Sequence, residues 1–497
     1  MKKHCLQLFR CPALTGGCRL QLVCLLAYFL CVTGESTVVI NEFVASNGAT
    51  LADEDGDYGD WIELYNRGTD PVMLHGWSLS DDPERPSRWR FPPVVVPGGE
   101  YLLVWATGKD RDDPSAPLHT NFSIAAAGEP LRLSRIDGST ADEVDPVELP
   151  RDISYGRGTG GDADRWFYFE EPTPGAENRT QAYEGLLEPP VVIIVADASG
   201  DGATVTIDHP HKGVALHYTL DGSRPDETRE TYSGPFQIGQ PPPTNDGLAW
   251  IQTSPPEMED AGFPWLPPQG PVERVQTVRA KAVKPGYLPP HIASATWIPN
   301  GMRDAKPKIG IASITIDPDD LFHPAMGIYV PGDIYETLGF NHSDVAGRPN
   351  ANYHQRGSKW ERTAHIEYFS PNENVSRING HVGLRIHGAT SRALPQKSLR
   401  IYDRAAYNDE RILKSTAFFG GNSAPSLLRT LILRNSGNDL GMTHLRCGLA
   451  QEIVRHLRFH TQNYAPVSLF INGNYWGIHN APIVSDGLGQ GSADGFA

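Results

Sequence analysis

The stretch DEDGDYGDWIELYN, Asp53 to Asn66, decides how the first part of the chain is interpreted. In its second half polar and apolar residues alternate, so that Ile62 and Leu64 fall on one face. Because successive side chains of a β-strand point to opposite faces, this alternation predicts a strand that buries one face. The acidic first half is either a turn that leads into the strand or a metal-binding loop.

Short strand-like runs surround this stretch. VVINEFVAS, GWSLS, YLLVWA and LRLSRI are separated by turn clusters such as SDDPERP and VPGGE. Strands at this spacing predict a β-sandwich over residues 35–178. A second set of runs, among them ATVTIDHP, ALHYTLDG and TVRAKAV, predicts another sandwich over residues 188–298. Within it, residues 240–271 are rich in proline and glycine and are interpreted as a surface insertion.

Residues 303–486 mix strands with one helical pattern and therefore predict an α+β unit. Strand-like runs include GIASITI, HVGLRIHG and VSLFING. Between Thr443 and Leu457 apolar residues recur every four positions, as on one face of a helix. Cys447 falls in this pattern and is interpreted as a core residue. Residues 487–497 form a glycine-rich tail.

Composition and charge exclude some classes of partner. The 497 residues carry a formal net charge of −16, which argues against nucleic acid or an anionic membrane surface. Residues 1–34 begin with basic side chains and continue into a short apolar run, Leu20 to Val32, the pattern of a secretory signal. We therefore expect a secreted or cell-surface protein with no membrane segment beyond the leader.

The acidic loop has two interpretations. An EF-hand would need glycine and glutamate where Tyr58 and Leu64 stand, so that pattern fails. A looser calcium site formed by Asp53, Asp55 and Asp57 is physically sensible, because carboxylates are hard oxygen ligands. The simpler alternative is a solvated turn whose glycines take positive φ before the strand. The turn predicts that calcium binding is weak or absent.

The stretch GLRIHGATSRALPQKSLRIYD is the best candidate for chemistry in the third unit. Glycine and Ser391 in a hairpin, followed by Lys397 on a strand, form an arrangement that covers and grips phosphates. Glu452 on the later helix would pair with Lys397, as an acidic helix residue does in protein kinases. The alternative is an exposed basic strand and a surface glutamate.

Two segments resemble known β-sandwich modules. VVINEFVASNGATLADEDGDYGDWIELYNRGTDPVMLHGWSLSDDP is similar to the lamin tail domain of exported bacterial proteins, an immunoglobulin-like interaction module. LHYTLDGSRPDETRETYSGPF with VRAKAVKPGY resembles the chitobiase/β-hexosaminidase C-terminal domain, a fibronectin type III-like accessory module. The resemblances imply two all-β immunoglobulin-like sandwiches whose partners are extracellular or envelope proteins or glycans.

The third unit resembles the spore-coat protein H (CotH) kinase-like family. TIDPDDLFHPAMGIYV, GLRIHGATSRALPQKSLRIY, LRNSGND and LFINGNYWGIHN carry the resemblance, which implies an α+β atypical kinase-like fold that uses ATP with magnesium. It also implies that Lys397 holds phosphates and that Glu452 is its helix partner. Arg385 and Ser391 would belong to the covering hairpin.

The family's catalytic and metal-binding aspartates lie downstream of NGNYWGIHN, and the sequence that follows here matches neither motif. The expected kinase-like domain is therefore incomplete, and no catalytic residue is assigned. Two functions remain open. One is an exported multidomain protein with sandwich interaction modules and a kinase-like unit that is not catalytic as given. The other is an incomplete sequence of an active, secreted, ATP-dependent protein kinase.

Overall fold

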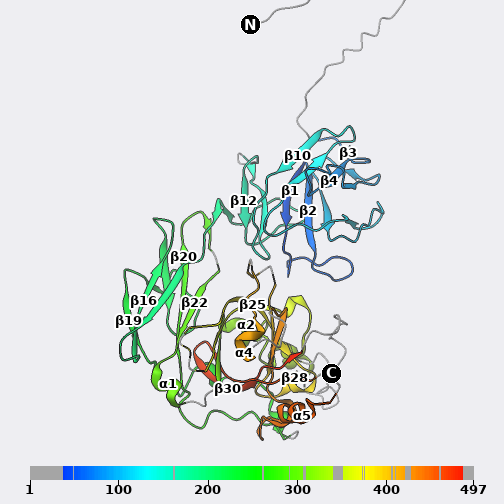
Figure 1. The fold of residues 1–497 in the computed structure, drawn as a ribbon. Helices are drawn as coiled ribbons and strands as arrows, with labels where there is room; N and C mark the ends of the chain where they lie inside the picture. The colour runs from blue at the N-terminus through cyan, green and yellow to red at the C-terminus, as the bar shows by residue number, and fades with distance from the viewer. Residues whose placement is uncertain are drawn as a thin grey trace, which may run out of the picture.

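The computed structural model describes residues 37–48, 50–160, 163–259, 262–289, 291–305, 309–339, 351–371, 373, 375–404, 407–408, 410–419, 427–457 and 461–484. The expected leader (1–34) and the glycine-rich tail (487–497) lie outside this part of the chain. Figure 1 shows three units in chain order: a blue-to-cyan unit, a green unit and a unit that runs from green to red. The predicted fold class, two all-β immunoglobulin-like sandwiches followed by an α+β unit, is confirmed.

The first unit packs a large sheet on a small one. The large sheet has the order β13 (Ala182–Tyr183), β12 (Trp166–Phe169), β11 (Ser154–Arg157), β1 (Val38–Val44), β2 (Asp60–Asn66), β7 (Tyr101–Ala106), β8 (Leu118–His119). The small sheet has the order β10 (Thr140–Val144), β9 (Leu131–Ser134), β4 (Ser78–Ser80), β5 (Trp89–Arg90). A separate pair consists of β3 (Val72–Met73) and β6 (Val95–Val96).

Strand β2 forms where the alternation predicts it, but it buries both faces. Ile62 and Leu64 are fully buried in the core between the two sheets. On the other face Trp61 is fully buried with Val44 and Trp105, so this face is not exposed to solvent. Residues distant in sequence therefore cover the second face of this strand.

The second unit is a smaller sandwich. One sheet has the order β15 (Val191–Ala196), β16 (Gly202–Asp208), β19 (Phe236–Gly239). The other has the order β18 (Glu230–Thr231), β17 (Ala215–Thr219), β20 (Gln276–Val283), β22 (Ala293–Trp297). Alternate residues such as Val205 and Val278 fill the space between them. A parallel pair, β14 (Gly185–Leu186) with β21 (Tyr287–Leu288), lies where the first unit leads into the second.

The proline-rich insertion at 240–271 is not confined to the surface, which corrects its interpretation. Met258, on the short 3-10 helix Pro256–Glu259, is 1% exposed and belongs to the core of the third unit. Thr253 Oγ1 donates a hydrogen bond to the carbonyl of Pro395 at 2.7 Å. The insertion therefore fastens the second unit to the third through its few apolar residues.

The third unit is built on one sheet with the order β27 (Thr430–Leu433), β26 (Ser398–Tyr402), β25 (Ile378–His387), β24 (Arg362–Phe369), β23 (Gly310–Ile316), β29 (Pro466–Ile471), β30 (Asn474–Asn480). Only the pair β23–β29 in this sheet is parallel. Helices α1 (Asn300–Ala305), α2 (Pro318–Phe322), α3 (Gly332–Leu338), α4 (Ser415–Phe419) and α5 (Arg446–Val454) accompany it, with the strand pair β28 (Gln462–Asn463) and β31 (Ile483–Val484). The core on one face of the sheet includes Ile314, Ile366 and Leu399.

Helix α5 is shorter and more exposed than its pattern predicts. Leu449 and Ile453 on it are 59% and 60% exposed. Cys447 is exposed, so its interpretation as a core residue was wrong. The buried side of the helix carries Gly448, where an added Cβ would meet the ring of Tyr464 at 2.5 Å. In the described part of the chain, no helix has the length and apolar character that a membrane crossing requires.

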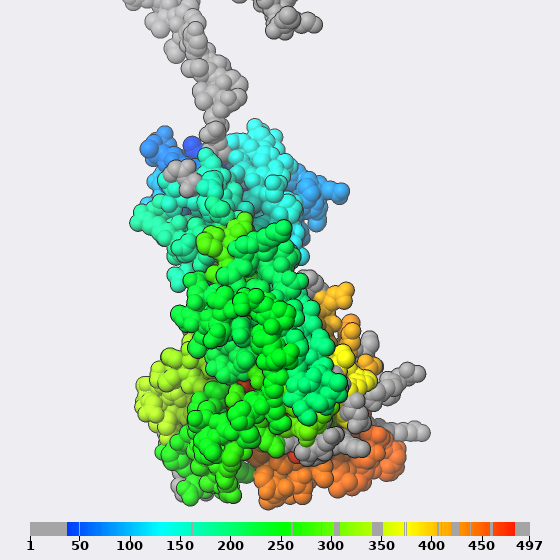
Figure 2. Space-filling model, turned by 90° about the vertical axis from the view of Figure 1, so that its left-hand side faces the viewer, coloured from blue at the N-terminus to red at the C-terminus, as the bar shows by residue number. Residues whose placement is uncertain are grey.

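The second and third units are in direct contact. Val275 and Ile298 of the second unit share an apolar cluster with Ile311, Phe369 and Phe470 of the third. Figure 2 shows the green second unit lying below the blue-to-cyan first unit and against the yellow and orange part of the third. The outer face of the third unit's sheet, opposite its core, is therefore partly covered by another module.

Candidate functional site

The acidic loop before β2 closes around a lysine. The carboxylates of Asp53, Asp55 and Asp57 lie 2.6, 2.7 and 2.9 Å from the ammonium nitrogen of Lys109. Their oxygens are close enough together to hold a metal ion. Hydrogen bonds from Lys109 and Arg111 lower the pKa of Asp55 to about 2, so its carboxylate is charged at neutral pH. The ammonium group thus occupies the place that a cation would take.

The same loop has the geometry of a tight turn. Asp53 accepts the backbone N–H groups of Asp55 and Asp57 at 3.0 and 2.9 Å. Gly56 has φ of 82°, a conformation that suits glycine and few other residues. The loop therefore has the hydrogen bonds of a turn and an internal counter-ion.

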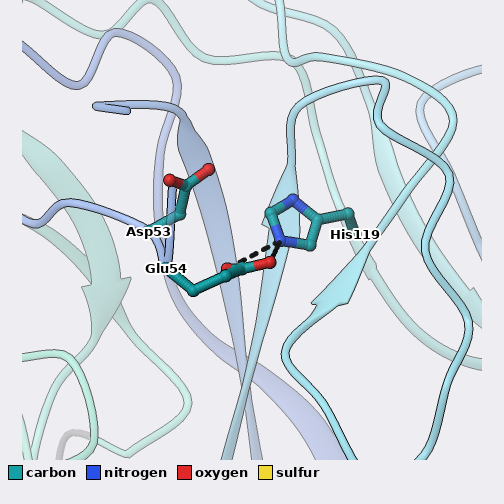
Figure 3. Close-up of side chains that lie close together, drawn as sticks. All are labelled: Asp53, Glu54 and His119. Carbon is teal, nitrogen blue, oxygen red and sulfur yellow. Dashed lines mark hydrogen bonds and ion pairs between the residues drawn. The ribbon is translucent and has the colours of Figure 1, made fainter. Parts of the chain in front are cut away.

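A buried histidine fixes the other side of this loop. His119 is fully buried, and its Nε2 lies 3.0 Å from Glu54 Oε1, as Figure 3 shows. Its Nδ1 lies 2.8 Å from Thr107 Oγ1. The connectivity of Thr107, His119 and Glu54 is that of a hydroxyl–imidazole–carboxylate relay. Since the imidazole is sealed from solvent, we assign these contacts to holding the loop.

We predict that Lys109→Met creates a calcium site that the natural chain lacks. Removing the ammonium leaves three converging carboxylates, of which Asp55 keeps its ion pair with Arg111 at 2.6 Å, and their remaining repulsion favours a bound metal ion. Calorimetry should find a Kd of about 10⁻⁴ to 10⁻³ M for the variant, the range of extracellular calcium modules, and at least tenfold weaker binding for the natural chain. Lys212→Met, at an exposed lysine of the second unit, is the matched control. Equal binding by natural chain and variant would show that Lys109 does not compete with calcium.

Lys397, the expected phosphate ligand, lies inside the core of the third unit. Its side chain is fully buried, and Nζ donates to the carbonyls of Arg392 and Leu394 at 2.8 and 3.0 Å. The ammonium lies 4.0 Å from the ring centroid of Tyr353. Burial, and next the charge of Arg392, hold the pKa of Lys397 well below its usual value. These contacts are those of a structural lysine.

The predicted pair between Lys397 and Glu452 does not form. The Glu452 side chain is 62% exposed on α5 and pairs with Arg455 at 2.8 Å. Lys397 instead points to the core face of the sheet, where tyrosine rings and carbonyl oxygens surround it. The physical reason is that Glu452 faces solvent on its helix while Lys397 is sealed inside.

Arg385 and Ser391 lie on separate structures. Ser391 is on a 3-10 turn, Thr390–Ala393, and its Oγ is 2.2 Å from where a Cβ on Gly388 would lie. Arg385 NH2 lies 2.7 Å from the Oε2 atom of Glu361, which is fully buried. Arg385 therefore forms an ion pair with Glu361, whereas the Ser391 side chain packs against Gly388.

Glu361 is the centre of a polar cluster that sequence reasoning missed. Arg385 and Arg404 contact its Oε2 at 2.7 and 3.1 Å. Arg151 of the first unit lies 3.4 Å from Oε1, and the Tyr407 hydroxyl donates to Oε1 at 2.7 Å. Three guanidinium groups thus share one carboxylate at the contact between the first and third units. No local spacing reveals the cluster, because Arg151 comes from another module.

The outer face of β25 and β26 is basic. Arg385 and Arg400 are direct cross-strand partners, although like charges in that position repel. The guanidinium carbons of Arg385, Arg400 and Arg404 lie 4.7, 5.3 and 4.7 Å from the ring centroid of Tyr402. Burial, and then four arginine charges, lower the pKa of His387 to about 4, the arginines being Arg400, Arg392, Arg434 and Arg356. In a chain of charge −16, this face is a local concentration of positive charge.

Comparison with protein families agrees with the three-unit structure. The Lamin Tail Domain family matches residues 32–148, and the Fn3 associated family matches residues 205–297. The CotH kinase protein family matches a short segment, residues 384–482, which includes the end of β25, all of β26 and α5. A search of curated proteins finds no match to the chain. The chain thus carries the combination of modules that its sequence resembles.

Proposed function

We propose that this chain is an exported binding protein in which the CotH-like unit joins two interaction modules and does not transfer phosphate. The observation that carries the proposal is the position of Lys397. Phosphoryl transfer needs a lysine that reaches the phosphates and carboxylates that hold magnesium. In the described residues Lys397 is sealed in the core and its ammonium contacts carbonyl oxygens and tyrosine rings.

The same unit offers a different place for the phosphates of ATP. Arg400 lies on the outer face near His387, and the charges of Arg400, Arg434 and Arg356 contribute to the lowered pKa of that histidine. Guanidinium groups bind phosphate oxygens in a fork-like geometry and do not lose their charge. We therefore propose that ATP, with or without magnesium, binds weakly through its phosphates on this face.

The two sandwiches are the proposed partner-binding modules. They are β-sandwiches, and they match families of accessory domains. In such modules the loops at the ends of a sandwich are free to bind partners, because the sheets themselves supply a rigid scaffold. Extracellular or envelope proteins or glycans are the proposed ligands, and secretion through the leader would bring the protein to them.

The decisive test combines label transfer and ATP binding in the full chain. We predict no incorporation of label from γ-labelled ATP with magnesium or manganese. Arg434→Ala should weaken ATP binding about tenfold, because a hydrogen bond to a charged group contributes about 1.5 kcal/mol. Lys397→Met should leave ATP binding unchanged, and Arg455→Ala, at an exposed arginine of α5, is the control.

Two outcomes would contradict this proposal. Label transfer that disappears in the Lys397→Met variant would support the ATP-dependent protein kinase, the alternative that the family match at 384–482 favours. Loss of ATP binding in that variant, with Arg434→Ala unaffected, would place the phosphates at Lys397 and not on the outer face. Circular dichroism of each variant shows whether it is folded.

A further inference from the structure

The contact between the second and third units changes in character from one end to the other. On the outer face of β23 the residues Ile311, Ser313 and Thr315 follow one another, and on β24 their partners are Phe369, Glu367 and His365. Ile311 and Phe369 belong to the apolar cluster shared with the second unit. The contact is therefore apolar at one end and polar at the other.

The polar end of the contact is closed by side chains from both units. Thr296 Oγ1 of the second unit lies 2.8 Å from Ser313 Oγ. Arg279 of the second unit is 5% exposed and donates to the carbonyl of Gly222 at 2.9 Å and to that of Ile316, in the third unit, at 3.4 Å. These polar groups are buried away from water, so they depend on one another for their hydrogen bonds.

Histidines gather at this polar end. His365 on β24 is 7% exposed, and its ring centroid lies 5.3 Å from that of His381 on β25. The centroid of His291, from the loop before β22 of the second unit, lies 5.1 Å from that of His381. The three rings thus run from the buried contact to its exposed rim, and one of them belongs to the opposing unit.

The polar end also holds buried atoms without a hydrogen-bond partner. Among the described residues they include Thr277 Oγ1, Arg279 Nε, Thr315 Oγ1, His365 Nδ1 and Glu367 Oε2. Each such atom costs part of the free energy that closing the contact gains. The polar end is therefore held weakly, in contrast to the apolar end.

We infer that the second unit is an acid-sensitive cover of the third unit's sheet, which opens at the polar end and turns about the apolar cluster. A proton on His365 or His381 would place a cation beside Arg279 in a contact that excludes water. Opening lets water solvate both charges. The backbone bond from Val275 N to the Gly473 carbonyl, 2.9 Å long, stays at the hinge.

The direction of the pH effect follows from the histidines. Burial lowers the pKa of His365 to about 4 from 6.5 and that of His381 to about 3, and Arg279 acts in the same direction. A histidine whose pKa is lower in the closed state than in the open state stabilises the closed state at pH values above its open-state pKa. The stabilisation is lost as pH falls from 6.5 towards 4.

The other charged groups of this contact act against or alongside the histidines. Burial raises the pKa of Glu367 to about 8, so Glu367 favours the closed state as pH falls from 8 to 4.5. Asp317 and Asp320 attract Arg279 and Arg224 repels it. Between pH 6.5 and 4.5 two histidines act against one glutamate, and below pH 4.5 Glu367 has no further effect, so the histidines determine the sign of the result.

The test uses a thiol probe in the chain from residue 35 onward, which omits the five cysteines of the expected leader. Thr315 is 2% exposed and opposite His365, so the variant Thr315→Cys places a thiol inside the closed contact. Exposed Cys447 serves as an internal reference. We expect the labelling of the introduced thiol by 4,4′-dithiodipyridine, relative to Cys447, to rise at least tenfold as pH falls from 6.5 to 4, with unchanged far-ultraviolet circular dichroism.

Histidine variants decide the cause. In the Thr315→Cys background, His365→Gln with His381→Gln should abolish the rise, and each single change should move its midpoint to lower pH. His211→Gln, at an exposed histidine of the second unit, should leave it unchanged. No rise in the parent, the same rise in the double variant, or a rise that coincides with lost secondary structure would overturn the inference. A folded single variant suffices if the double variant does not fold.

Discussion

Replacing Glu361 with alanine is expected to lower the free energy of unfolding of the third unit by about 3–5 kcal/mol, the cost of removing one partner from a buried charge cluster. Its carboxylate is fully buried and contacts Arg385, Arg404 and Arg151 at 2.7, 3.1 and 3.4 Å. Without it, these cations repel one another, and Arg151 and Arg385 are largely shielded from water. The Glu361 carboxylate fits at this place because residue 383 is glycine: an added Cβ there would lie 2.4 Å from Glu361 Oε1.

The same substitution should loosen the first unit from the third, because Arg151 is the first unit's contribution to the cluster. Urea denaturation of the full chain, followed by hydrogen exchange in β24 and β25, measures the loss. Glu373→Ala is the matched control, since Glu373 pairs with Arg377 and its side chain is 37% exposed. A surface pair of this kind contributes about 0–1 kcal/mol. A loss at Glu361 as small as that of the control would mean that water or another anion already balances the arginines.

The sequence predicts the strands and the modules because their signal is local. Alternation in DWIELYN is a property of adjacent residues, and it placed β2 at Asp60–Asn66 correctly. What covers the second face of that strand is not local. Trp61 packs on Trp105, which the chain reaches only after several turns. For the same reason the sequence did not predict that Met258 packs in the core of another unit.

The candidate sites depend on contacts between residues that are even farther apart in the sequence. The acidic residues before β2 predict a cation, and the structure supplies one from Lys109, which no spacing rule links to them. Glu361 draws its partners from two units. A basic strand such as LPQKSLRIY shows that lysine and arginines are present, but only the register of β25 and β26 shows that Lys397 faces the core and Arg400 the outside. Burial of a charge is therefore the property that the sequence conveyed least.

The second large effect is expected in the first unit, where acid should stabilise the fold. Glu42 and Glu63 are cross-strand partners on β1 and β2, and both are fully buried. Glu42 accepts a hydrogen bond from Ser154 at 2.6 Å. Glu63 accepts from Asn41 at 2.8 Å and from the backbone N–H of Gly175. These acceptors hold the closing loop of the sandwich on its sheet.

Burial is the main cause that raises the pKa of Glu63 to about 8, and the charge of Glu42 adds to it. Its unfolded value is 4.5, so the folded state binds a proton between pH 4.5 and 8 that the unfolded chain releases. The stabilisation is complete below pH 4.5 and is lost as pH rises through 8. From this shift we expect the first unit to lose on the order of 5 kcal/mol over that range.

Glu63→Gln should remove the part of this pH dependence that Glu63 contributes, because glutamine resembles the protonated carboxyl at every pH. Hydrogen exchange of the β1 and β2 amides between pH 4.5 and 8, corrected for the intrinsic exchange rate, measures it. Glu143→Gln, at a half-exposed glutamate of β10, should keep the parent's slope. Asp60 leaves a slope of the same sign up to about pH 7, since burial raises its pKa from 3.8 to about 7. An unchanged slope in the Glu63 variant would mean that Glu63 is charged when folded. The expected sign is opposite to that of the histidine contact, so mild acid should tighten the first unit while it opens the cover of the third.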